Sequence, residues 1–174
     1  MQDGAGISSW RRRPARRARS SALTIARIGI IFAKEPPTKL IESAGIADRT
    51  LIIPPHARDV AVTSTERFDV PVRLVAFLPH MHLRGTRFRY EAEKPDGTTM
   101  RLLDVPSYDF NWQHRYLLRD HLALPAGTRL HVTGWFDNSV ANPANPDPSA
   151  EVPWGPQTYE EMSVGYVEYY VDRE

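Results

Sequence analysis

The run Val72-Arg73-Leu74-Val75-Ala76-Phe77-Leu78-Pro79-His80-Met81-His82 joins an apolar, strand-like segment to two histidines at its end. Side chains two positions apart on a β-strand point to the same face, so His80 and His82 can present both imidazoles to one point. Two imidazoles suit copper, zinc, iron or nickel. The run therefore predicts a β-strand that ends at a candidate metal site.

A methionine near the C-terminus offers a third ligand. Met162 directly precedes a second strand-like run over residues 163–171. Because a soft thioether favours Cu(I), His80, His82 and Met162 together indicate a redox copper site. The alternative is a chance pair of histidines and a methionine that fills the core.

The rest of the chain predicts an all-β fold. No segment keeps a helical period for three turns, and turn sequences such as Lys94-Pro95-Asp96-Gly97 separate short apolar or alternating runs. Many short strands, together with 15 prolines, favour an antiparallel β-sandwich of jelly-roll type. The predicted strands are 27–34, 49–53, 59–63, 70–82, 87–93, 99–105, 114–118, 129–136 and 163–171.

Residues 137–157 form one long connection rich in Pro, Asn and Asp. We expect a rigid structure built from turns that brings Met162 towards the histidines, in which the Asn and Asp side chains cap backbone groups. Calcium binding by the same oxygens is the alternative. These side chains are Asp137, Asn138, Asn142, Asn145 and Asp147.

Length and charge indicate one domain preceded by a basic tail. Residues 1–22 hold six arginines and one aspartate, a net charge of +5, which leaves −4 of the total of +1 for residues 23–174. We predict a disordered tail over 1–22 and a single domain over 23–174. A mildly acidic domain argues against nucleic-acid binding, and no apolar stretch is long enough to span a membrane.

Two further features concern export and cysteine chemistry. Arg27 interrupts the apolar run that follows the arginines, so the sequence shows no clear signal peptide. The chain has no cysteine, which excludes disulfides, thiolate ligands and cysteine nucleophiles.

An ordered set of motifs resembles the C-terminal domain of the copper type II, ascorbate-dependent monooxygenases. That family includes peptidylglycine α-hydroxylating monooxygenase and dopamine β-monooxygenase, and the motifs resemble those of bacterial multidomain proteins that carry this module more than those of these two enzymes. The resemblance covers about residues 27–171. Its motifs are His80-Met81-His82-Leu83-Arg84-Gly85, Tyr108-Asp109-Phe110-Asn111-Trp112-Gln113, Leu124-Pro125-Ala126-Gly127-Thr128, Trp135-Phe136-Asp137-Asn138-Ser139 and Trp154-Gly155-Pro156-Gln157-Thr158-Tyr159-Glu160-Glu161-Met162.

The resemblance implies a copper enzyme with a sandwich fold. In the family, the residues matching His80, His82 and Met162 bind one copper, where dioxygen is activated and a substrate C–H bond is hydroxylated. Tyr166 matches a substrate-binding tyrosine. Ascorbate is the external reductant, the location is extracytoplasmic, and an upstream domain supplies electrons from a second copper.

The chain departs from the peptide-hydroxylating members at several positions. Leu78 stands where an arginine helps to bind the substrate carboxylate, and Ser163 and Gly134 stand where two cysteines form a disulfide. Peptide-glycine substrates are therefore disfavoured, and the substrate stays open. No histidine precedes His56, so we expect the electron-transfer copper domain elsewhere, in cis or in trans.

Two other classes of protein fit part of the pattern. One is a non-catalytic copper- or ligand-binding β-module of a larger protein. The other is a cupin-like metalloprotein, but Thr86 and Arg87 replace the glutamate of the first cupin motif, and His131 comes one residue too late for the second.

The aromatic and histidine residues outside the motif receive structural interpretations. We predict that Phe110 and Trp112 pack in the core, the alternative being that they line a cleft beside the copper. The other histidines are predicted to be surface residues or satisfied polar ones. These are His56, His114, His121 and His131.

Overall fold

The computed structural model describes residues 28–32 and 34–173. The chain divides into two units, Met1–Pro36 and Pro37–Glu174, and the strands lie in the second. The predicted tail over 1–22 and the predicted boundary at residue 23 lie outside the described residues. Residues 28–32 form no strand, so the strand predicted over 27–34 is wrong there. The apolar side chains of residues 28–32 are exposed, Ile31 to 99%, and these residues pair with no strand among the described residues.

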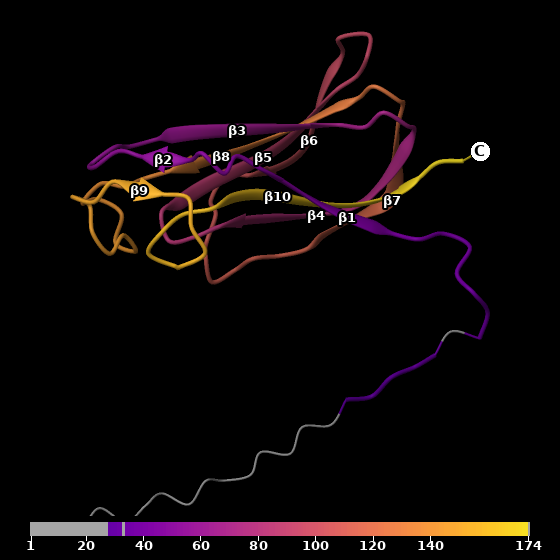
Figure 1. Cartoon of the computed structure of the whole chain (residues 1–174), viewed down its shortest axis with the longest axis horizontal. Helices are drawn as coiled ribbons and strands as arrows, with labels where there is room; N and C mark the ends of the chain where they lie inside the picture. The colour runs from indigo at the N-terminus through magenta and orange to yellow at the C-terminus, as the bar shows by residue number, and fades with distance from the viewer. Residues whose placement is uncertain (1–27, 33, 174) are drawn as a thin grey trace, which may run out of the picture. The chain divides into compact units, whose positions relative to one another are not determined.

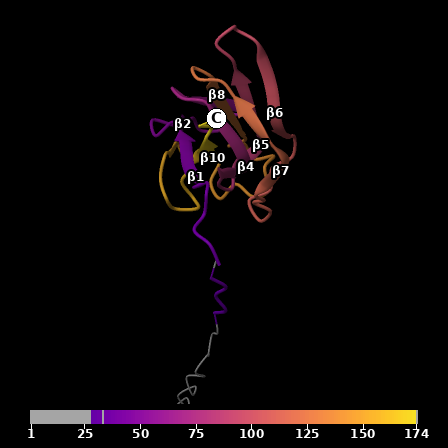
Figure 2. The same ribbon diagram turned by 90° about the vertical axis from the view of Figure 1, so that its right-hand side faces the viewer.

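The described part of the chain is an all-β, antiparallel sandwich without helices. The first sheet has the order β1 (Glu42–Ala47), β10 (Ser163–Val171), β4 (Val72–Met81) and β7 (Tyr116–Leu124). The second has the order β3 (Val60–Arg67), β8 (Arg129–Phe136), β5 (Gly85–Glu93) and β6 (Thr99–Val105). The strands β2 (Ile52–Ile53) and β9 (Val152–Pro153) pair separately. Figures 1 and 2 show the two sheets as layers, which confirms the predicted fold class; the jelly-roll assignment stays a prediction.

Sequence patterns located most of the strands but missed two of them. The predicted strands over 99–105, 129–136 and 163–171 match β6, β8 and β10 at both ends. No strand was predicted for β1 or β9. The β1 sequence Glu-Ser-Ala-Gly-Ile-Ala has low intrinsic strand propensity. It forms a strand because six of its residues pair with β10, from Glu42 opposite Tyr169 to Ala47 opposite Val164.

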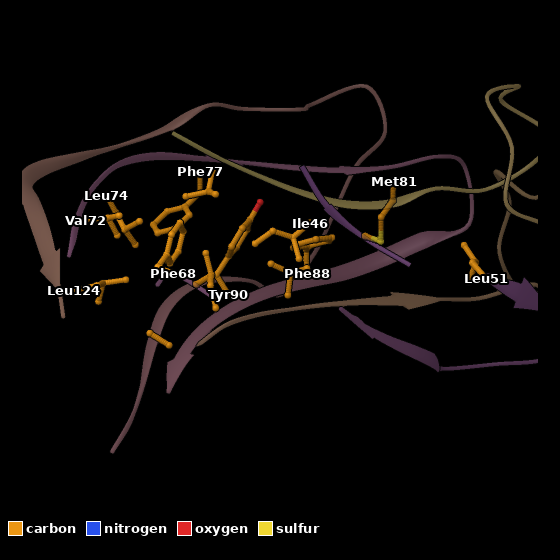
Figure 3. Close-up of a cluster of buried hydrophobic side chains, with 14 of the residues drawn as sticks. Ile46, Leu51, Phe68, Val72, Leu74, Phe77, Met81, Phe88, Tyr90 and Leu124 are labelled. Atoms are coloured by element: carbon orange, nitrogen blue, oxygen red, sulfur yellow. The ribbon is translucent and has the colours of Figure 1, made fainter. Parts of the chain in front are cut away.

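The core lies between the two sheets (Figure 3). Period-two alternation buries Phe88, Tyr90 and Ala92 of β5, and their neighbours in sequence are partly exposed. Tyr90 packs against Phe77 of the facing sheet, with ring centroids 4.7 Å apart, and its hydroxyl donates to the Tyr166 carbonyl at 3.1 Å. The backbone of β10 at Tyr166 is thus tied to the core between the sheets.

A bulge in β4 determines which face of the sheet carries the histidines. Before it, Val72 and Leu74 face the core; after it, Phe77 and Met81 do. Leu74 pairs with Tyr169 and Ala76 with Glu168, so Val75 has no partner on β10. The extra residue changes the phase of the alternation, and His80 comes to lie on the face opposite the core.

The long connection after β8 is ordered by its own amide and carboxylate side chains. Asn138 is fully buried, and its Nδ2 donates to the carbonyls of Pro54 and Ala150, both at 2.9 Å. Asp137 and Asp147 accept from backbone N–H groups two residues ahead, at 2.8 and 2.9 Å. These bonds confirm the predicted turn capping. One side-chain oxygen of each of the five Asn and Asp residues of this connection accepts a hydrogen bond.

Candidate metal centre

His80 and His82 lie side by side at the end of β4, with ring centroids 5.2 Å apart and an angle of 83° between the rings. The Nδ1 atom of His80 lies 2.7 Å from the side-chain oxygen of Gln113, and that of His82 lies 3.0 Å from the Glu160 carbonyl. Since both partners accept, each Nδ1 carries the proton. Each Nε2 is then left with a free lone pair, the state of a metal-binding imidazole.

The surroundings of His82 favour its neutral form. His82 is only 4% exposed, and burial lowers the pKa of its imidazole; the Glu160 carbonyl opposes this shift, and the charge of His80 adds to it. Because a metal binds the neutral imidazole, the lowered pKa reduces proton competition for the site.

Met162 and Tyr166 belong to the segment next to the histidines. Ser163 pairs with Met81, so the preceding Met162 falls next to His82 along the ladder. Glu161 and Ser163 are buried whereas Met162 is partly exposed, as alternation requires for a residue on the histidine face. Tyr166 lies on the same face, with its ring centroid 6.3 Å from that of His80. The structure thus brings all four predicted site residues to one region.

A buried carboxylate beneath the histidines was not predicted. Glu161 has no exposed surface, and its two oxygens accept the backbone N–H groups of His82 at 2.8 Å and Arg84 at 2.6 Å. Burial raises the pKa of Glu161 to about 7, against the opposing effect of these amides and of the Arg84 charge. This side chain ties the segment of Met162 to the segment of His82.

Arg84 is the buried cation of the same network, with 1% of its surface exposed. Its Nε donates to Asn138 Oδ1 and its Nη1 to the Tyr159 carbonyl, both at 2.8 Å. An arginine in an otherwise polar stretch gives no sequence signal of burial, since arginine is mostly exposed in proteins. Its presence in a recognised motif was the one sign of its importance.

The segment Tyr108–Gln113 supports the histidines from the other side. The Tyr108 hydroxyl donates to the Met81 carbonyl at 2.7 Å and accepts from the Met81 N–H at 2.9 Å. Burial raises the pKa of Tyr108 to about 12, which keeps it a donor at neutral pH. The predicted core packing is wrong for Trp112, which is 66% exposed, while Phe110 lies 6.1 Å from the His82 ring between centroids. The alternative of a wall beside the metal site fits Phe110.

The other histidines take no part in this arrangement. His131 lies on β8 of the second sheet and bonds Thr65 and Glu93, and His121 bonds the Tyr170 hydroxyl. His56 and His114 are exposed. These placements agree with the prediction of surface or satisfied residues. A cupin-like site would need His131 beside His80 and His82, but His131 belongs to the other sheet.

The described residues contain neither a second candidate metal cluster nor a membrane-spanning helix. Within 28–32 and 34–173, no three His, Asp or Glu side chains are placed to hold a metal ion together. No helix in the described part of the chain could cross a membrane.

Two imidazoles lie side by side at the end of one strand of a β-sandwich, and the Nδ1 atom of each is hydrogen-bonded. This arrangement is typical of a metal-binding domain. Residues 41–174 match the family described as copper type II ascorbate-dependent monooxygenase, C-terminal domain. The chain belongs to this family of copper-dependent monooxygenase domains, which confirms the resemblance seen in the sequence motifs.

The chain was also compared with curated proteins and with solved structures. No curated protein matches it. Among solved structures it is similar to the VP2 subviral particle of infectious bursal disease virus, at 12% sequence identity and a TM-score of 0.38. That match covers 84% of this chain and 37% of the viral chain.

Proposed function

We propose that this domain binds one copper ion through His80, His82 and Met162 and is the dioxygen-activating half of a monooxygenase that hydroxylates a C–H bond. The observation that supports the proposal is the pair of Nδ1 hydrogen bonds, to Gln113 and to Glu160, which leave both Nε2 atoms available to bind a metal. A thioether as the third donor favours Cu(I). When bound, copper supplies the one-electron chemistry that dioxygen activation needs.

The protein residues then have separate tasks. Gln113 and the Glu160 carbonyl orient the imidazoles, and Glu161 fixes the backbone of His82. We propose Met162 as the third ligand and Tyr166, whose ring centroid lies 6.3 Å from that of His80, as a residue that contacts the substrate. Three protein ligands leave a coordination position open, as catalysis at a metal requires.

The source of electrons is proposed from the family. We expect ascorbate as the external reductant and a second copper on an upstream domain, in cis or in trans, as the electron-transfer partner. We also propose an extracytoplasmic location, where a domain without cysteines has no thiol to lose by oxidation.

Copper titration of the full chain under reducing conditions tests the proposal. We expect one Cu(I) per chain by calorimetry, loss of more than about 100-fold in affinity for His80→Ala, and about 10-fold for Met162→Ala, because a thioether binds more weakly than an imidazole. His114→Ala is the matched control, since it removes an exposed histidine that is outside the site.

Two results separate the possible failures. Equal affinity in His80→Ala, Met162→Ala and the control would contradict the ligand set. A different result would be copper binding that depends on His80 and Met162 in a protein that consumes no ascorbate or dioxygen once the electron-transfer domain is supplied. That result would identify the domain as a non-catalytic copper-binding module.

The bond between Gln113 and His80 gives a second prediction for the same assay. Gln113→Ala is expected to lower Cu(I) affinity by about 10- to 100-fold, because the His80 ring loses the acceptor that fixes its tautomer and orientation. Asn111→Ala, which changes another exposed amide on the same segment, is the control and should bind as wild type does. A Gln113→Ala affinity equal to that of the control would show that the bond does not support the ligand.

A further inference from the structure

A cavity of about 130 Å³ opens on the outer face of the first sheet, beside the metal centre. Its lining residues are Ser43, Phe77, Leu78, Tyr166 and Glu168. Tyr166 is the direct link to the site, since its ring centroid lies 6.3 Å from that of His80. Leu78 lies directly opposite Tyr166 and two residues before His80 on β4. A group held in this cavity is therefore about one side chain away from the two imidazoles.

The single charged residue of the lining is already neutralised. Glu168 accepts from Arg115 at both carboxylate oxygens: Nε donates to Oε1 at 2.7 Å and Nη2 to Oε2 at 2.5 Å. The pair is a two-point fork, the strongest geometry for arginine and a carboxylate. A charged ligand would have to break this pair to obtain a counter-ion, or remain unpaired beside Leu78 and the ring of Tyr166.

Size and lining define what fits. A cavity of roughly 150 Å³ lined by apolar side chains is large enough to bind benzene, so 130 Å³ corresponds to about one ring or a short branched alkyl group. Leu78 and the ring of Tyr166 supply apolar side-chain surface, whereas the side chain of Phe77 faces the core. Ser43 and Tyr166 each carry a hydroxyl that can make a neutral polar contact.

From this cavity we infer the substrate class of the proposed function, on which the inference rests. The cavity takes an uncharged aromatic or apolar group, so the molecule presented for C–H hydroxylation is neutral at that end. Arg115 is a specificity-determining residue in this arrangement. It neutralises Glu168, so that the cavity offers no free counter-ion to an anionic or a cationic ligand.

Binding of three matched probes to the metal-free full chain tests this class. Phenylacetamide is neutral, phenylacetate is anionic and phenethylamine is cationic, and all three carry the same ring on a short chain. In NMR titrations at pH 7 we expect phenylacetamide to bind at least about 10-fold more tightly than either charged probe, with shifts at Leu78 and Tyr166.

Two variants make the test specific. Leu78→Arg adds an unpaired guanidinium to the lining and is expected to reverse the order in favour of phenylacetate. Leu117→Arg adds the same charge at an exposed position of β7 that does not line the cavity, and should preserve the wild-type order. Both positions tolerate a long side chain better than a core site, because neither is fully buried.

The outcomes overturn the inference or support it independently of copper. Equal or tighter binding of a charged probe, no binding of any probe, or an unchanged order in Leu78→Arg would each overturn it. Copper titration of the same sample shows whether the metal site stands. A chain that binds copper through its histidines but prefers phenylacetate retains the proposed function and loses only the neutral substrate class.

Discussion

Glu161→Ala is expected to lower the free energy of unfolding by about 3–5 kcal/mol, because the backbone N–H groups of His82 and Arg84 would both lose their acceptor in a buried site, at about 1–3 kcal/mol each. The variant also removes an acidic group whose charge favours the buried guanidinium of Arg84. Urea unfolding followed by far-UV circular dichroism measures the change.

The control and the reversal of this effect come from the same region. Glu151→Ala removes an exposed carboxylate of the preceding connection and should change stability by less than about 0.5 kcal/mol. Arg84→Met in the Glu161→Ala background should cost much less than Arg84→Met alone, since no unpaired charge remains to be buried. Additive losses would show that Arg84 and Glu161 do not interact.

The network also links stability to the metal centre. Because Glu161 holds the backbone of His82, we expect Glu161→Ala to weaken Cu(I) binding even at temperatures where the protein remains folded. Glu161→Gln keeps one acceptor oxygen and should lie between wild type and Glu161→Ala in both measurements. A variant that unfolds more easily but binds copper with wild-type affinity would separate the two roles.

Replacing Gly134 and Ser163 by cysteines is expected to form a disulfide that stabilises the domain by about 3–4 kcal/mol. The two residues lie on β8 and β10, in different sheets, and the bridge would close a loop of about 30 residues. A Cβ atom on Gly134 would lie 2.7 Å from Ser163 Oγ, within reach of a bridge. The structure thus places in contact the two positions that the family resemblance identifies with a lost disulfide.

The stabilisation has a local cost. The same Cβ atom would lie 2.9 Å from Met81 Sδ, so the thioether must move. Ser163 Oγ is buried and has no hydrogen-bond partner among the described residues, so its removal breaks no bond. Gly134→Ala adds the Cβ without the bridge, so its crowding against Met81 should lower the free energy of unfolding by about 1–3 kcal/mol.

Thermal unfolding of the double cysteine variant, before and after reduction, isolates the effect of the bridge. We expect the oxidised form to melt about 10 °C above the reduced form, given about 2–4 °C per kcal/mol for a domain of this size. Mass spectrometry confirms the oxidation state. Equal melting temperatures in a fully oxidised sample would contradict the geometry at Gly134.

What the sequence determined follows from local periodicity and from ordered motifs. Short apolar or alternating runs defined the bounds of β6, β8 and β10, and β8 shows the alternation that a half-buried strand imposes on its own sequence. The His80-Met81-His82 motif and Met162 indicated copper from ligand chemistry alone. The ordered motifs identified the family that matches residues 41–174.

Tertiary structure decided the features that depend on distant partners. The bulge at Val75 determines which face of β4 carries His80. This bulge appears only when β4 pairs with β10. The acceptors for the two Nδ1 atoms come from Gln113 and Glu160, which are remote in sequence and gave no local signal. Arg84 and Glu161 are charged, and residues of this kind are rarely fully buried in proteins. Both are buried here because Glu161 accepts the backbone N–H of Arg84, and the Arg84 guanidinium donates to the Tyr159 carbonyl near Glu161. Only the folded chain brings these two segments together.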